Sequence, residues 1–435
     1  MNFYLFAYNL LVSGLALFAF PFVWAFARKD ETGKAALAQR LGYQPAGHGA
    51  AHQGCRCLWI HAVSVGEVKA ADAIVDALAA IQPELAFLVT TTTATGQRYA
   101  QELFSNRATV RYAPIDLWWS TRRFLNIYRP DMLAIMETEI WPNWIASARK
   151  IGISVVFLNG RISARSICSY LKIRPLIKPL LAQVNAFSMI SEQDAHRVRQ
   201  LGAPANRVTI NGNVKMDIGN QPSDDSLTDG LMRLFSLNMQ TPVFVAGSIR
   251  GAELGILIDV CERLISKLPE LVIILAPRHI ENANQIAQLA SQRNMKWQYR
   301  SRLSGQANGR YAPIVILDTI GELRHVYCVA SVVFCGASLV PLGGQNVLEA
   351  AVWAKPVLYG PYMDDFEDAR LLLEEYGGGM SVTDGGTLTG QALRLLTRPD
   401  EANRLGRLAR CAVMASQGAA RRHAQVVLDQ LSKGR

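Results

Sequence analysis

The chain has 435 residues, half of them hydrophobic, and a formal net charge of +10 at pH 7. This length predicts two or three domains, and the positive charge favours anionic partners such as anionic lipid or phosphorylated and carboxylated ligands. No run of consecutive basic residues forms an arm of the kind that binds nucleic acid, so we expect no nucleic-acid partner. The seven cysteines are odd in number and lack a zinc-binding spacing, which predicts a reducing compartment, no disulfide framework and no structural metal.

The first 27 residues contain no charged side chain and are long enough to cross about 30 Å of hydrocarbon. Arg28 and Lys29 follow directly, which places the rest of the protein on the cytoplasmic side. A cleaved signal peptide is the main alternative, because residues 25–27 resemble a cleavage site, but no basic residue precedes the apolar run. We therefore predict an uncleaved anchor that spans or embeds in a membrane, with Pro21 as a point where it could bend into the interface.

Apolar runs rich in strand-forming residues alternate with helical patterns through the rest of the chain, which is typical of parallel sheets covered by helices on both faces. A polar, turn-rich stretch interrupts this rhythm, so we predict two Rossmann-like domains with a cleft between them. The predicted parts are an anchor at 1–27, a first domain at 28–218, a linker at 219–240 and a second domain at 241–435. The predicted strands are 58–65, 86–91, 132–136, 154–158 and 186–190, then 242–246, 271–276, 313–317, 331–335 and 356–359.

The first of these strands runs into Gly66 and Glu67, and a helical pattern begins at Val68. Gly66 would allow a tight turn, which would leave Glu67 among the unpaired N–H groups of the first helical turn, where the dipole favours an anion. We therefore expect Glu67 to be ionised, to act as a general base at the sheet edge that binds ligands, and to sustain activity into mildly acidic conditions. The alternative is that Glu67 only stabilises the start of the helix.

A second motif lies late in the chain, where a Gly-Gly pair at 343–344 precedes a helix predicted to begin near Asn346. Two glycines let the backbone approach a phosphate, and the helix start offers N–H groups to that anion. Glu349, one turn further, could accept hydrogen bonds from ribose hydroxyls. This pattern is a moderately specific mark of nucleotide-sugar-dependent glycosyltransferases, although a glycine loop with a capped helix would look similar. Arg278 and residues 318–323 end other strands and are expected to face the same nucleotide.

Two carboxylates, Glu137 and Glu139, follow the strand 132–136. We predict that Glu137 faces the ligand, whereas Glu139 either does the same or caps the helix that starts near Pro142. Basic and apolar residues are interleaved between 161 and 181. That segment fits a membrane-facing element and an ordinary surface helix pair equally well.

Eight motifs follow one another along the chain: HAVSVGE at 61–67, TTTTATG at 90–96, METEIWPN at 136–143, NGRISARS at 159–166, GNVKMD at 212–217, PRH at 277–279, DTIGE at 318–322 and GGQNVLE at 343–349. In these motifs, and from its anchor to about residue 415, the chain resembles the bacterial 3-deoxy-D-manno-octulosonic acid (Kdo) transferases, which move Kdo from CMP-Kdo to a lipid A precursor. The resemblance implies an α/β fold with two Rossmann-like domains of the GT-B glycosyltransferase type and an N-terminal anchor helix in the bacterial inner membrane. It also implies an inverting, metal-independent and cofactor-free transfer to lipid IVA in lipopolysaccharide core biosynthesis.

For the site, the resemblance implies that Glu67 is the general base and that Glu137 and Lys215 stabilise the transition state. Gln345 and Arg250 depart from the residues that many relatives have, which affects fine contacts to the donor. Two other functions stay open: a GT-B enzyme that uses a UDP-sugar, and a non-catalytic membrane-bound sugar-nucleotide binder. The implied donor-binding residues are Pro277, Arg278, Ile320, Gly321, Glu322, Asn346, Val347, Leu348 and Glu349.

Overall fold

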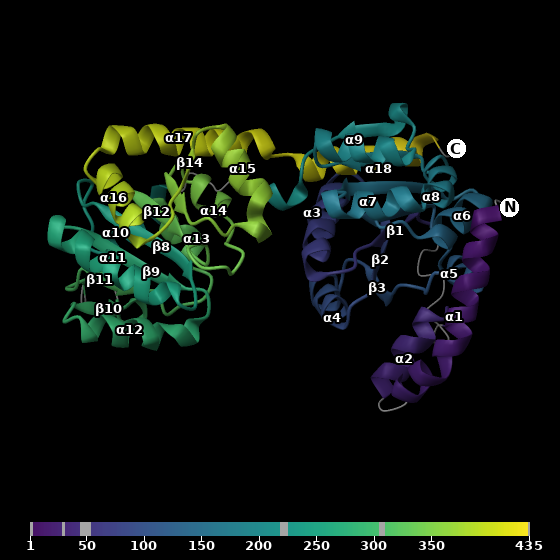
Figure 1. Ribbon diagram of the computed structural model, residues 1–435, viewed down its shortest axis with the longest axis horizontal. Coiled ribbons are helices and arrows are strands. Elements are labelled where there is room, and N and C mark those ends of the chain that lie inside the picture. The colour runs from purple at the N-terminus through teal and green to yellow at the C-terminus, as the bar shows by residue number, and fades with distance from the viewer. Residues whose placement is uncertain (1–2, 28–30, 44–53, 218–224, 304–308, 434–435) are drawn as a thin grey trace. The chain divides into compact units, whose positions relative to one another are not determined.

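The computed structural model describes residues 3–27, 31–43, 54–217, 225–303 and 309–433 (Figure 1). The chain divides into two compact units, one made of residues 1–217 and 418–435 and the other of residues 218–417. Each unit is built on a parallel sheet of seven strands, which confirms the predicted α/β architecture.

The first sheet has the strand order β3-β2-β1-β4-β5-β6-β7. The chain runs outward from β1 to β3 and then returns to β4 on the other side of β1, so the strand order reverses between β1 and β4. Ligands bind at such a reversal, beyond the carboxyl ends of the strands. The strands are β1 (Cys57–His61), β2 (Ala86–Thr91), β3 (Thr109–Tyr112), β4 (Met132–Met136), β5 (Ser154–Gly160), β6 (Ala186–Met189) and β7 (Val208–Ile210).

Two hydrophobic cores lie on opposite faces of this sheet, because successive side chains of a strand point to opposite sides. Trp59 of β1 belongs to the core on one face, whereas its neighbours Leu58 and Ile60 belong to the core on the other. The helices of this unit are α1 (Phe3–Ala27), α2 (Glu31–Arg40), α3 (Val65–Ile81), α4 (Ala94–Leu103), α5 (Trp118–Tyr128), α6 (Pro142–Lys150), α7 (Ala164–Lys172), α8 (Arg174–Leu181), α9 (Glu192–Leu201) and α18 (Ala419–Lys433).

The second sheet has the strand order β10-β11-β9-β8-β12-β13-β14, which reverses between β8 and β12. Its strands are β8 (Val243–Ile249), β9 (Val272–Pro277), β10 (Trp297–Tyr299), β11 (Ile314–Ile316), β12 (Val332–Cys335), β13 (Val357–Tyr359) and β14 (Gly379–Ser381). Its helices are α10 (Asp225–Leu234), α11 (Glu253–Lys267), α12 (Ala283–Gln292), α13 (Leu323–Val326), α14 (Leu348–Ala351), α15 (Glu367–Glu375), α16 (Gly385–Leu396) and α17 (Pro399–Ser416).

The structure differs from the predicted domain division in two places. Helix α18 returns to the first unit, where it packs on α3 and on β5 and β6, so the second unit ends at residue 417 and not at 435. Helix α10 lies within the predicted linker 219–240 and belongs to the second unit. An amphipathic pattern shows that a helix covers a sheet, but it does not show which of two sheets is covered.

Candidate active site

Glu67 lies in the first turn of α3, which starts just beyond the carboxyl end of β1. Its carboxylate accepts hydrogen bonds from the backbone N–H of Val63 at 2.9 Å and from the hydroxyl of Ser64 at 3.1 Å. The prediction for Gly66 was wrong: α3 begins at Val65, and Gly66 is part of the helix without a left-handed backbone. Glu67 lies beyond the carboxyl end of a parallel strand, as predicted, and its two hydrogen bonds also make it part of the helix start.

The electrostatic environment of Glu67 is the reverse of the predicted one. Burial raises the pKa of this carboxyl group to about 7, and the negative charges of Glu137 and Glu139 add to the increase, against the opposing hydrogen bonds from Val63 and Ser64. Desolvation therefore outweighs the favourable helix N-terminus, since the residue is only 8% exposed. A carboxylate with a pKa near neutrality is well matched to proton transfer at physiological pH, whereas the expected activity in mild acid is not supported.

Glu137 and Lys215 form an ion pair beside this carboxylate. The Lys215 Nζ atom lies 2.5 Å from a carboxylate oxygen of Glu137, and the lysine side chain remains 41% exposed. Glu137 and Thr138 both have left-handed backbone, with φ of 53° and 63°, a conformation that costs energy for residues other than glycine and clusters at functional sites. A Cβ atom at Gly66 would lie 3.7 Å from the Lys215 Nζ atom, an ordinary van der Waals distance, so Gly66 lies beside the ammonium group.

The carboxylate of Glu139 contacts two aromatic side chains rather than the start of α6. It accepts a hydrogen bond from the Trp141 indole N–H at 3.0 Å and lies 3.4 Å from Nε2 of His61. The opposite imidazole nitrogen of His61 is hydrogen-bonded to Thr90 at 2.9 Å. The start of α6 is capped by Asp116, whose carboxylate accepts the backbone N–H of Asn143 at 3.0 Å, so the alternative that Glu139 caps this helix was wrong.

The candidate donor-binding residues gather at the carboxyl edge of the second sheet. Arg278 follows β9 and is exposed, and its backbone N–H donates to the carbonyl of Ile249 at 2.9 Å. Ile320, which follows β11, is 86% exposed, and Gly321 has left-handed backbone with φ of 85°. Glu322 accepts hydrogen bonds from Arg300 at 2.9 Å and Thr319 at 2.8 Å, so its carboxylate already has two local partners.

The Gly-Gly loop that follows β12 needs both of its glycines. Gly343 and Gly344 have φ of 85° and 76°, and a Cβ at either would collide with Asp365 or Met363. The Asn346 side chain accepts the backbone N–H of Leu348 at 3.1 Å. The side chains of Val347 and Leu348 are fully buried, so these two residues could meet a ligand only through their backbone.

Known proteins identify the family of this chain. Residues 35–218 match the family described as 3-deoxy-D-manno-octulosonic-acid transferase (kdotransferase). The 3-deoxy-D-manno-octulosonic acid transferase of Haemophilus influenzae is 30% identical over 402 residues, which cover 92% of each chain. The enzyme of that name from Bordetella pertussis is 30% identical over 435 residues, which cover 98% of this chain and 99% of its own. The chain belongs to the Kdo transferase family. It is therefore a glycosyltransferase.

Solved structures agree on the fold. The UDP-GlcNAc 2-epimerase of Neisseria meningitidis matches with a TM-score of 0.56 at 11% identity, covering 87% of this chain and 100% of its own. MurG of Acinetobacter baumannii matches with a TM-score of 0.54 at 15% identity, covering 87% of this chain and 99% of its own. Likeness at such low identity shows the fold alone, and it confirms the predicted GT-B architecture of this Kdo transferase.

One residue of the donor half was missed by the sequence analysis. Glu253 of α11 is completely buried, and its carboxylate accepts backbone N–H groups from Ala337 at 2.6 Å, Ser338 at 3.0 Å and Leu339 at 2.9 Å. This carboxylate ties α11, which follows β8, to the loop after β12, across the reversal of the second sheet. Gly344 is bonded to the same loop through the Ala337 carbonyl at 2.8 Å. A Glu in the first turn of a predicted helix was the available signal, but its partners lie more than 80 residues away.

His423 was also missed, because it lies in α18, the helix assigned to the wrong unit. Its Nε2 atom lies 3.0 Å from the Gly212 carbonyl, and its Nδ1 atom lies 2.6 Å from the Ser188 hydroxyl. Burial lowers the pKa of this imidazole to about 4, so it is neutral. The side-chain oxygen of Asn159 accepts a hydrogen bond from the backbone N–H of Val214 at 2.9 Å, and the backbone N–H of Asn159 donates to Nδ1 of His423 at 3.4 Å. Helix α18 thereby supports the segment that carries the catalytic candidate Lys215.

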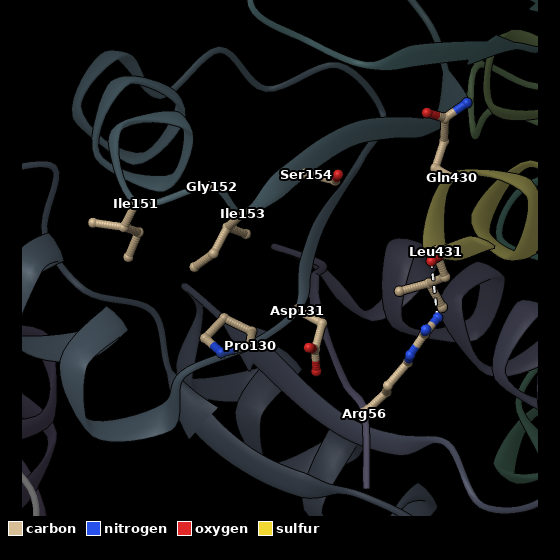
Figure 2. A pocket seen from close by; sticks show the side chains of 9 residues that line it. All are labelled: Arg56, Pro130, Asp131, Ile151, Gly152, Ile153, Ser154, Gln430 and Leu431. Carbon is tan, nitrogen blue, oxygen red and sulfur yellow. Dashed lines mark hydrogen bonds between the residues drawn. The ribbon is translucent and has the colours of Figure 1, made fainter. Parts of the chain in front are cut away.

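A cavity of about 280 Å³ in the first unit is a separate feature (Figure 2). It is lined by Arg56, Asp131 and residues 151–154, which lie at or before the amino ends of β1, β4 and β5, together with Gln430 and Leu431 of α18. Arg56 points toward α18 and donates to the Leu431 carbonyl at 2.8 Å (Figure 2). The cavity lies at the sheet edge opposite to Glu67, and ligands of α/β folds bind at the carboxyl edge.

Proposed function

We propose that this transferase moves Kdo from CMP-Kdo to a lipid A precursor in lipopolysaccharide biosynthesis, by an inverting displacement that requires no metal ion. One observation carries the proposal. In this member of the Kdo transferase family, Glu67 lies at the strand-order reversal of the first sheet, where the charge of Glu137 acts on it and Glu137 is paired with Lys215. The curated relatives are named for Kdo transfer over nearly the whole length of this chain.

In the proposed reaction, Glu67 removes the proton from the acceptor hydroxyl as its oxygen attacks the anomeric carbon of Kdo. The bond from that carbon to the phosphate oxygen breaks on the opposite face, and CMP leaves with the electron pair. A positioned base of this kind is worth roughly 10²–10⁴ in rate. Lys215 and Arg278 supply fixed positive charge for the carboxylate and phosphate of the donor, which is the role that a metal ion has in other transferases.

The donor-binding set is proposed to act in two ways. Pro277, Arg278, Ile320 and Gly321 would meet the nucleotide through exposed side chains and backbone at the ends of β9 and β11. The second group, Glu322, Asn346, Val347, Leu348 and Glu349, would use carboxylates and backbone N–H groups.

Membrane attachment is proposed to rest on α1, the one helix in the described part of the chain that is long and apolar enough to cross a membrane. Leu171 and Ile173, at the end of α7 and the start of α8, are 43% and 49% exposed and could add to the attachment. Other apolar residues of that element, Ile177 and Leu180, are buried in the core. We propose that the segment 161–181 packs on the core with one part of its apolar residues and faces the membrane with the other. The inner membrane, with the catalytic units on its cytoplasmic side, is the proposed location.

The pH dependence of the reaction is the first prediction. Because the pKa of Glu67 is raised to about 7, the base is deprotonated above this pH, and kcat/KM should fall as the pH drops through about 7. Glu139→Gln removes one of the negative charges that raise this pKa, so the acidic limb should move to lower pH. An acidic limb near the ordinary glutamate range in the parent enzyme would contradict the assignment of Glu67.

The donor site gives a second prediction. Glu349→Ala should weaken CMP binding by about 1–3 kcal/mol, the scale of hydrogen bonds to a charged group. Glu270→Ala removes an exposed carboxylate that precedes β9 and should leave the affinity unchanged. Calorimetric titration with CMP measures both variants. An unchanged affinity in Glu349→Ala would assign this residue a structural role only.

The donor class is tested by thermal-shift titration of the full chain with CMP and with UDP. The proposal predicts that CMP raises the melting temperature at concentrations where UDP has no effect. A larger shift with UDP would favour the alternative of a UDP-sugar enzyme, and a shift with neither nucleotide would contradict the assigned donor site.

A further inference from the structure

Helix α1 is docked on the first unit along one stripe. Among its residues, those that are half-buried recur every three or four positions, as one face of a helix does. Tyr8, Asn9 and Ser13 all lie on this stripe, whereas Leu17, Phe18 and Phe22 on the rest of the helix are at least 70% exposed. The stripe consists of Leu5, Tyr8, Asn9, Val12, Ser13 and Ala16.

The Tyr8 hydroxyl ties this stripe to a buried carboxylate of the domain. It donates to Asp116 at 2.8 Å, and Asp116 is 3% exposed. The same carboxylate accepts the backbone N–H groups of Asn143 and Trp144 at the start of α6. The Trp144 ring contacts His61 at 4.7 Å between centroids, so the anchor helix is joined to the residues beside Glu139.

Helix α2, which follows α1 in the chain, is attached to the domain next to Asp116. This helix ends at Arg40, whose carbonyl accepts the backbone N–H of Ile115 at 2.8 Å and the hydroxyl of Ser120 at 2.7 Å. Residues on both sides of Asp116 thus hold the end of α2, while Asp116 itself holds Tyr8. The Tyr8 part of α1 and the end of α2 are thus attached to one short segment of the domain.

A bilayer-spanning helix cannot satisfy these contacts. Tyr8 and Ala27 are about 28 Å apart along the helix axis, at 1.5 Å per residue, and the hydrocarbon core is about 30 Å thick. If Ala27 lay at the membrane surface next to the domain, Tyr8 would lie near the opposite surface. Asp116 could not reach it there.

We propose that α1 lies along the membrane surface on the domain's side, embedded through its outer apolar faces, with both of its ends on that side of the bilayer. This inference rests on the proposed membrane attachment of the transferase, and the partner of the exposed faces is the lipid interface. The uncharged surface of α1, with Phe18 and Leu17 more than three-quarters exposed, fits acyl chains and headgroup boundaries. The hydrogen bond from Tyr8 to Asp116 fixes the helix on the domain.

The test compares the side of the membrane on which two thiols lie. One cysteine is placed in a short Gly-Ser extension fused before Met1 of the full chain, and native Cys411, which is exposed on α17, reports the side of the catalytic units. Spheroplasts are treated with a membrane-impermeant maleimide before or after permeabilisation, and labelled peptides are identified by mass spectrometry. Labelling of both thiols under the same condition is expected. Labelling of the extension in intact spheroplasts, with Cys411 labelled only after permeabilisation, would overturn the proposal. Since no activity is measured, this outcome is independent of the assigned reaction.

Discussion

Replacing Glu67 by glutamine should lower the rate of Kdo transfer by roughly 10²–10⁴ while the fold and the affinity for CMP persist. The amide oxygen of glutamine can still accept the Val63 N–H, and its nitrogen can donate to the Ser64 hydroxyl, so the helix start is kept. Only the ability to take a proton is lost. Turnover under saturating donor and acceptor, together with melting temperature and CMP titration, measures the three quantities separately.

The matched control is Glu192→Gln, because Glu192 also lies in the first turn of a helix of the same unit, with its side chain 72% exposed and paired with Arg199. This variant should turn over at the parent rate. If Glu67 serves only the helix start, Glu67→Gln should cost at most about 1 kcal/mol of stability and retain near-normal turnover. That result would remove the base from the proposed mechanism.

Replacing Lys215 by methionine should produce the second large effect, a fall in turnover of roughly 10²–10³, the scale of one lost electrostatic group in a transition state. The ammonium group of Lys215 is paired with the carboxylate of Glu137. Its loss also leaves the negative charge of Glu137 uncompensated, and this charge raises the pKa of Glu67. The acidic limb of kcat/KM should therefore move to higher pH in the variant.

Lys69→Met is the control for Lys215→Met, since Lys69 belongs to the same helix as Glu67 but lies over the ring of Tyr99. Its turnover and pH profile should match those of the parent. Lys215→Arg keeps the charge and should restore the position of the acidic limb, even if its longer guanidinium lowers the rate. A Lys215→Met enzyme with parental turnover would show that the ion pair is structural.

The predicted strands were found where they carry long buried apolar runs. Strands 86–91 and 132–136 have the predicted bounds, and both lie inside the first sheet. The strands that were missed, β3, β7, β10 and β14, are the outermost strands of the two sheets. Each has only three or four residues and is partly exposed, as in β14 with its Gly379, so the hydrophobic signal is too short to detect.

The candidate site shows a similar division between local and distant information. The position of Glu67 follows from a strand and a helix that adjoin in sequence. The raised pKa of Glu67 does not follow from these two elements, because it is caused by burial and by the charges of Glu137 and Glu139, which lie after β4. The buried partners of Glu253 lie on a loop more than 80 residues later, and Gly212 and Ser188, which contact His423, lie more than 200 residues earlier. Long-range contacts of this kind leave no periodic trace in the sequence.

The central claim is tested most directly by mass spectrometry of the lipid product. The purified full-length chain is incubated with CMP-Kdo and a lipid A precursor in detergent, and free CMP is measured in the same reaction. The account predicts a lipid whose mass has increased by whole Kdo units, with one CMP released for each unit added. An unchanged lipid and no released CMP, under conditions where the chain is folded and binds CMP, would contradict it.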